Sequence, residues 1–255
     1  AKMSGINMYN LLSQLVDNFN GDIIVKLENI IKKIFNKNNL IVSLSGDQET
    51  LDLLTEATKE LKLEESVLDN ELNISYEKLE SDALIIPSGV NCNVKGMNLT
   101  DLGKELDGSL YVIQHILNYD HLWPEVRVKG GAYGCSLSLS ISNDILFGSF
   151  SDPNVANTYN VYDSVARYLE EFNPNIDEFN SYLIGTIAKV DPPASIYSKI
   201  ATSDKNLLCN ITLERLEKVK SEILSTDINT VKSYASLFRK IAQQSILFTV
   251  GNENK

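Results

Sequence analysis

The segment from Leu122 to Gly134 holds the residues whose types and spacing best fit chemistry on a peptide. Its sequence is LWPEVRVKGGAYG, in which Arg127 and Tyr133 stand six positions apart with two glycines between them. An arginine presents a rigid fork of N–H donors that suits peptide carbonyls or a carboxylate. A tyrosine hydroxyl is a neutral donor on a rigid ring. Together the two side chains could anchor a peptide and stabilise the oxyanion that develops when its amide is attacked.

A purely structural role for these two residues is the competing interpretation. Arg127 can make an ion pair at the surface, and Tyr133 can cover the end of a hydrophobic core. Composition alone favours this structural interpretation, so the functional one needs support from the surrounding sequence.

Metal ligands are scarce in this sequence. The chain has 2 histidines, His115 and His121, and neither an HExxH nor an HxxEH pattern occurs. A predicted helix carries an apolar stripe formed by Leu106, Leu110, Ile113 and Leu117. His115 lies about 180° around the helix from this stripe, so we expect it to face away from that packing surface. We predict no metal site in this chain and expect its histidines to be solvent-facing or hydrogen-bonded.

Other catalytic chemistries have weak support. No GxSxG motif occurs, the serines of residues 136–142 fit the solvent face of a strand, and Cys135 has no neighbouring base in the sequence. The glycine-rich run from Gly130 to Gly134 leads into that strand and not into a helix N-terminus. It is therefore a poor candidate for binding a nucleotide phosphate.

The elements around this segment alternate between helices and strands. Apolar alternation and turn residues predict strands over residues 40–45, 83–86, 90–94, 136–142, 145–150 and 245–250. Apolar residues at helical spacing predict helices over residues 4–36, 51–61, 106–117, 155–169, 176–187, 212–224 and 227–242. Pro124 is expected to stop the third of these helices, and Asp152-Pro153 to open the fourth. Residues 63–82 are predicted as a loop, and the order indicates an α+β layered domain with a largely antiparallel sheet.

Composition and charge narrow the function classes. Hydrophobic residues make up 43% of the 255 residues, enough for a substantial core. The net charge is -11 and no long run of lysine and arginine occurs, so we expect no nucleic-acid partner. An acidic surface suits basic peptides, although solubility alone also explains it.

The cysteines and the hydropathy bear on location. Cys92, Cys135 and Cys209 form no CxxC pair, which fits a reduced compartment, and we predict a cytoplasmic protein. No stretch approaches the roughly 20 apolar residues of a membrane span, so we expect no membrane partner.

The segment closely resembles the C-terminal signature of the presequence-protease branch of the pitrilysin/insulinase zinc metallopeptidases. The resemblance rests on LWPEVRVKGGAYG, on the preceding ILNYDH, on the following SFSDPN and on the helix with YDSVARYLEEF. The early MSGI and NLIVSLSGD also resemble the last domain of that family. The similarity extends over nearly the whole chain and is densest from residue 100 to 175.

The resemblance implies a LuxS/MPP-like metallohydrolase fold, the last of four related α+β domains that form a two-bowl chamber. It implies a zinc cofactor held by an HxxEH motif and a downstream glutamate in the first domain, outside this chain. It also implies catalytic roles across the chamber, with Arg127 anchoring the substrate backbone and Tyr133 stabilising the oxyanion.

On this basis we expect the C-terminal domain of a zinc endopeptidase that degrades short unstructured peptides, inactive alone. Residues 1–38 are predicted as a helical lead-in that packs on a preceding domain, and residues 39–255 as the C-terminal peptidase domain. The expected partners are the N-terminal half of the same polypeptide and peptide substrates, and apolar surface on the lead-in would favour self-association. The alternatives are a non-catalytic peptide-binding or assembly subunit of the same fold and an unrelated α+β binding module.

Overall fold

The computed structural model describes residues 5–63, 65 and 80–252. The chain divides into two compact units, one comprising Ala1–Tyr76 with Ile196–Asp204 and the other Glu77–Ser195 with Lys205–Lys255. The predicted boundary between residues 38 and 39 stays a prediction, because this division concerns packing within the chain and not docking on a preceding domain. Of the predicted loop over residues 63–82, residues 64 and 66–79 lie outside the described residues.

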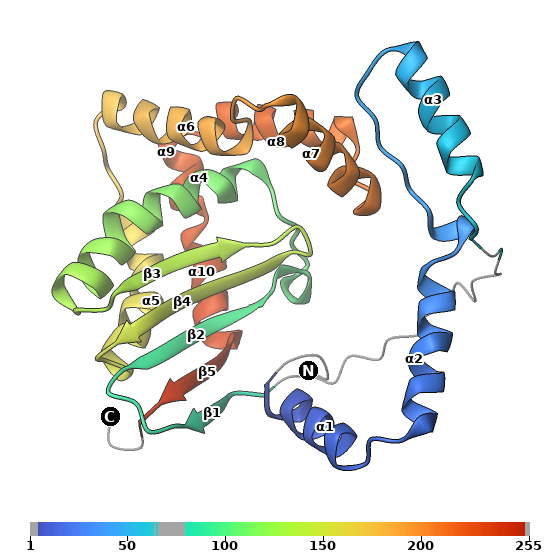
Figure 1. Ribbon diagram of the computed structural model, residues 1–255. Coiled ribbons are helices and arrows are strands. Elements are labelled where there is room, and N and C mark those ends of the chain that lie inside the picture. The colour runs from blue at the N-terminus through green and yellow to red at the C-terminus, as the bar shows by residue number, and fades with distance from the viewer. Residues whose placement is uncertain (1–4, 64, 66–79, 253–255) are drawn as a thin grey trace. The chain divides into compact units, whose positions relative to one another are not determined.

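The larger unit is built on a five-stranded sheet with the order β1-β5-β2-β4-β3. Its strands are β1 (Asp82–Ile85), β2 (Asn91–Asn98), β3 (Gly134–Leu139), β4 (Asp144–Asp152) and β5 (Ile246–Gly251). β5 pairs with β1 in parallel, and every other neighbouring pair is antiparallel. Figure 1 shows β5, in red, between β1 and β2, so the last described strand of the chain is an interior strand of the sheet.

One face of this sheet is covered by helices and the other carries exposed side chains. The covering helices are α4 (Gly108–Ile116), α5 (Ala156–Glu171) and α10 (Ala235–Gln244). Along β2 and β4 the alternation of a strand turns Asn93 and Phe147 toward the helices, where both are buried. On the opposite face Val94, Leu146 and Phe150 are exposed. Figure 1 shows α5 and α10 behind the sheet.

A second set of helices packs on α4 from the side away from the sheet. These are α6 (Ile176–Val190), α8 (Leu213–Ser225) and α9 (Ile228–Ser233). α4 is therefore buried on several sides, which explains its nearly continuous apolar sequence. The prediction of one helix over residues 227–242 is wrong, since Tyr234 separates α9 from α10. The short helix η2 (Leu99–Leu102) follows β2.

The smaller unit consists of helices with much exposed apolar surface. It contains α1 (Gly5–Asp17), α2 (Gly21–Ile34), η1 (Lys37–Asn39), α3 (Gln48–Lys59) and the part of α7 (Ile196–Leu208) up to Asp204. The sequence analysis does not predict α7. Residues 40–45 do not form the predicted strand, since no strand among the described residues pairs with their backbone. Leu40, Ile41 and Val42 are exposed there.

No helix in the described part of the chain is both long enough and apolar enough to span a bilayer.

Two glycines on the exposed sheet face give a matched test of this packing. A Cβ at Gly96 would lie 2.5 Å from the carbonyl oxygen of Ile145, whereas a Cβ at Gly148 would meet nothing within 4 Å. Gly96→Ala should lower the free energy of unfolding by about 1–3 kcal/mol. Gly148→Ala should leave it unchanged or raise it by up to about 1 kcal/mol. Urea unfolding followed by circular dichroism measures both, and equal midpoints would contradict the described register.

Candidate functional site

The site begins on a helix of unusual geometry. α4 continues without a break into the π-helix η3 (Leu117–Lys129), and the amide of Gly130 then bonds to the carbonyl of Glu125, 3.0 Å away. Pro124 lies inside η3, so the prediction that it stops the helix is wrong. In an α-helix a proline ring clashes with the carbonyl four residues earlier, and the wider turn of a π-helix relieves this clash. π-Helical turns occur frequently at functional sites.

Arg127 lies on η3 between two aromatic rings. Its Cζ is 4.0 Å from the ring centroid of Trp123 and 5.6 Å from that of Tyr133. The side chain is half-buried, and the guanidinium makes no ion pair with any residue that the structure describes. Arg127 therefore does not make, with any described residue, the surface ion pair that the structural interpretation requires.

Tyr133 stands at the start of β3 with its ring on the surface. The residue is 67% exposed, and its ring contacts Phe150 edge to face, with centroids 5.5 Å apart. A Cβ at Gly134 would clash with the Phe150 ring, so the glycine lets that ring approach the strand. Tyr133 does not cover the core, and the structure places it beside Arg127. The catalytic roles assigned to this pair stay predictions.

The two glycines between Arg127 and Tyr133 form the turn that brings the residues together. Gly131 has a φ of 81°, in the left-handed region that favours glycine. A Cβ at Gly130 would lie 2.5 Å from the carbonyl oxygen of Val126. The amide of Ala132 donates to the same carbonyl over 3.1 Å, and Ala132 is buried. The turn is therefore packed directly onto the end of η3.

Asp152 is the buried centre of the loop beside this turn. Its side chain is 0% exposed and accepts hydrogen bonds from Ser149 Oγ at 2.6 Å and Thr158 Oγ1 at 2.7 Å. It also accepts from Asn93 Nδ2 at 3.2 Å and from the amide of Asn154 at 2.8 Å. The prediction that Asp152 opens the next helix is wrong, because α5 begins at Ala156 and Asp152 ends β4.

This loop holds the turn that carries Tyr133. Asn154 Nδ2 donates to the carbonyl of Gly130 over 2.6 Å, and the amide of Tyr133 donates to the carbonyl of Ser151 over 3.2 Å. Ser151 has a φ of 47°, a conformation that costs energy for a residue with a side chain. Ser151 directly precedes Asp152, and the buried hydrogen bonds of Asp152 keep it in this strained conformation.

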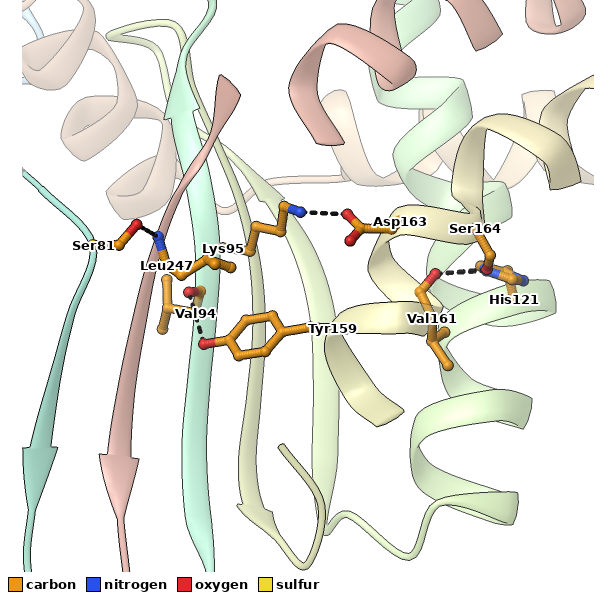
Figure 2. Close-up of polar contacts among 9 residues, drawn as sticks. All are labelled: Ser81, Val94, Lys95, His121, Tyr159, Val161, Asp163, Ser164 and Leu247. Atoms are coloured by element: carbon orange, nitrogen blue, oxygen red, sulfur yellow. Dashed lines mark hydrogen bonds and ion pairs between the residues drawn. The ribbon is translucent and has the colours of Figure 1, made fainter. Parts of the chain in front are cut away.

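Polar contacts also fix α5 against β2, as Figure 2 shows. Tyr159 Oη donates to the carbonyl of Val94 over 3.3 Å, and the buried Lys95 forms an ion pair with Asp163. Just before the edge strand β1, Ser81 Oγ accepts a hydrogen bond from the amide of Leu247 in β5 over 3.0 Å. α5 therefore has a fixed position relative to the sheet on which the site is built.

His121 joins η3 to α5. Its Nε2 lies 3.0 Å from Ser164 Oγ and 3.3 Å from the carbonyl of Val161 (Figure 2), and its ring stacks on Tyr168 with centroids 4.7 Å apart. Burial lowers the pKa of His121, which favours the neutral ring. His121 is therefore a hydrogen-bonded histidine in the packing between η3 and α5.

Neither of the other candidate groups lies in a catalytic arrangement. His115 is half-buried beside Gly185 of α6, and burial lowers its pKa. Its Nδ1 is buried and has no hydrogen-bond partner among the described residues, so the prediction of a solvent-facing or hydrogen-bonded histidine is wrong for His115. Burial raises the pKa of Cys135 to about 11, so its thiol stays protonated and donates to the carbonyl of Leu122. Across the described ranges, no three His, Cys, Asp or Glu side chains are grouped to hold a metal ion.

The sequence analysis missed three residues of the site, namely Trp123, Phe150 and Asp152. Trp123 stands four positions before Arg127, a spacing that puts two side chains on the same face of a helix, and this signal could have found it. Nothing in the sequence marks Phe150 as the neighbour of Tyr133, because that contact comes from the pairing of Gly134 with Phe150 between β3 and β4.

Asp152→Asn tests the buried hydrogen bonds. The amide nitrogen of an asparagine would face donors, so at least one charge-assisted bond is lost and the unfolding free energy should fall by about 1.5–3 kcal/mol. Asp101→Asn changes an exposed carboxyl in η2 and is the matched control, with an expected change within about 0.5 kcal/mol. Denaturant unfolding compares the two variants. Equal midpoints would mean that the Asp152 contacts contribute nothing to the fold.

Comparison with known proteins agrees with this architecture. The family model described as the PreP C-terminal domain matches residues 81–250. Protein HypA of Clostridium perfringens (strain 13 / Type A) is 32% identical over 258 residues, which cover 100% of this chain and 26% of that protein. Presequence protease 1, chloroplastic/mitochondrial, of Arabidopsis thaliana is 28% identical over 261 residues, covering 98% of this chain and 24% of that protein. The chain thus spans about a quarter of the length of these relatives.

Solved structures show the same fold. The crystal structure of a peptidase M16 inactive domain from Pseudomonas fluorescens aligns with a TM-score of 0.57 at 15% identity, covering 81% of this chain and 51% of that chain. The predicted α+β layered fold with a mostly antiparallel sheet is thereby confirmed. Since the family model covers most of the chain, this protein belongs to the family of the PreP C-terminal domain and is homologous to the presequence proteases.

Proposed function

We propose that this chain is the substrate-holding domain of a zinc-dependent endopeptidase that degrades short unstructured peptides. In this proposal Arg127 anchors the peptide backbone and Tyr133 donates a hydrogen bond to the developing oxyanion. One observation carries it, namely the adjacency of a guanidinium and an exposed phenol with 5.6 Å between Cζ and the ring centroid.

The chemistry of the pair supports this assignment. In an extended peptide every second carbonyl points to the same side, so carbonyls on one side repeat about every 6.6–7 Å, a spacing within reach of two long donor-bearing side chains that lie side by side. The fork of N–H donors on Arg127 can hold a ground-state carbonyl. Tyr133 is a neutral donor, and a donor aimed at the oxyanion favours the transition state over the substrate.

The residues that the structure describes offer no zinc site. The described donors do not fit a zinc ion, because His121 bonds to α5, His115 packs on α6, and no third ligand joins either of them. We therefore assign zinc and the base that activates water to a preceding part of the same polypeptide. The chain covers only about a quarter of the length of two longer relatives, which supports this division.

The openness of the site supports inactivity of the isolated chain. Tyr133 is 67% exposed, and a hydrogen bond to an oxyanion is weak where bulk water competes with it. A hollow of about 320 Å³ near Asp120 and Glu178 contains neither Arg127 nor Tyr133. Another part of the polypeptide would have to cover the pair to form an enclosed catalytic site.

The proposed partners follow from the surface. Exposed apolar side chains on α1 and α2, such as Leu11, Leu15 and Ile30, favour docking on the preceding part of the same polypeptide, or self-association when that part is missing. The net charge of -11 suits basic peptide substrates. A non-catalytic subunit of the same fold would have little use for an exposed arginine and tyrosine held this close together.

Tyr133→Phe in the full-length protein tests the proposal. Loss of one oxyanion donor should lower kcat for a short peptide by about 10²–10³ while KM changes little. Tyr119→Phe removes the hydroxyl of another exposed tyrosine on η3 and is the control, with turnover expected to match the wild type. If Tyr133→Phe cleaves within about twofold of the wild-type rate, Tyr133 is not the oxyanion donor.

A further inference from the structure

Trp123 is the only tryptophan of the chain, and it lies against Arg127. The Cζ of Arg127 is 4.0 Å from the centroid of the Trp123 ring, which is contact distance for a guanidinium on an aromatic face. Trp123 is 43% exposed, whereas its neighbour Leu122 and the following Val126 are buried in the core. The indole therefore lies on the surface beside Arg127 instead of filling the core.

The two residues are held on a rigid base. Trp123 and Arg127 both lie on η3, four positions apart, and Pro124 fixes the backbone between them. The carbonyl of Leu122 accepts a hydrogen bond from Cys135 of β3, and the carbonyl of Val126 accepts one from Ala132. The backbone on either side of Trp123 is thus attached to the strand that begins beside Tyr133.

An arginine on a surface loses conformational freedom when it binds a ligand, and that loss weakens binding. Contact with an aromatic face restricts the guanidinium in advance without using its N–H donors, because the attraction comes from the ring quadrupole. No carboxylate in the part of the chain that the structure describes forms an ion pair with Arg127, so these donors stay available for a ligand.

We infer that Trp123 is a positioning residue, which holds the guanidinium of Arg127 in the orientation that receives the backbone carbonyl of a peptide. This inference rests on the proposed function, in which Arg127 anchors the substrate. Trp123 acts through Arg127, so it affects substrate binding more than the chemical step. An aromatic ring is what the role requires, and tryptophan has the strongest attraction for a cation.

The test uses the full-length protein and steady-state cleavage of a short peptide. Trp123→Leu should raise KM by about 3- to 10-fold with kcat within about twofold, and Trp123→Phe should restore most of the loss. Arg127→Leu should raise KM at least as much, and the double variant Trp123→Leu/Arg127→Leu should be no worse than Arg127→Leu alone. Equal impairment by Trp123→Leu and Trp123→Phe, a parallel fall in kcat, or additive effects would overturn the inference.

The arginine variant separates the two hypotheses. If Arg127→Leu raises KM and Trp123→Leu does not, the positioning role is wrong and the proposed function stands. If Arg127→Leu leaves KM and kcat unchanged, the anchoring role of Arg127 is wrong, and the positioning role falls with it.

A second measurement decides the matter if Trp123→Leu does not fold. In this chain Trp123 is the sole source of tryptophan fluorescence, so Arg127→Leu, which leaves the indole in place, reports on the contact. Removal of the guanidinium should change the emission intensity and shift its maximum, whereas Arg167→Leu, at an exposed position on α5, should change neither. An emission spectrum of Arg127→Leu identical to that of the wild type would overturn the contact itself.

Discussion

The geometry of the site depends on the buried carboxyl of Asp152. Four donors converge on it, from β2, from β4, from the loop that follows β4 and from α5. A carboxyl group without access to water needs such donors, because burial without them costs several kcal/mol. Meeting this requirement fixes the end of β4 and the strained Ser151 in one conformation. The loop in turn forms hydrogen bonds with the carbonyl of Gly130 and the amide of Tyr133. The buried contacts of Asp152 therefore also fix the backbone that carries the proposed catalytic pair.

Two kinds of contact thus stabilise the site, one acting on the backbone and the other on the side chains. Buried hydrogen bonds fix the backbone, through Asp152, Asn154 and His121. Aromatic contacts at the surface orient the side chains, with Trp123 beside Arg127 and Phe150 beside Tyr133. Directional bonds suit the backbone because they fix a single conformation, whereas ring faces restrict a side chain and leave its donors available for a ligand.

The strength of a local signal decided what the sequence could predict. Strict alternation located β3, turn residues located β4, and the type and spacing of Arg127 and Tyr133 identified a pair that the structure places side by side. Pro124 was misleading because the rule for proline applies to α-helices and this segment is a π-helix. Residues 40–45 have the composition of a strand, but a strand also needs a partner for its backbone, which a local pattern does not supply. Asp152-Pro153 resembles a helix start, and only tertiary packing shows that Asp152 is a buried acceptor.

A structure of the full-length protein with an uncleaved peptide bound would show directly whether Arg127 and Tyr133 contact the substrate. We expect a guanidinium nitrogen of Arg127 and the hydroxyl of Tyr133 each to lie within about 3.2 Å of backbone oxygens that flank the scissile bond. A peptide bound for cleavage with neither side chain within hydrogen-bonding distance of its backbone would contradict this expectation.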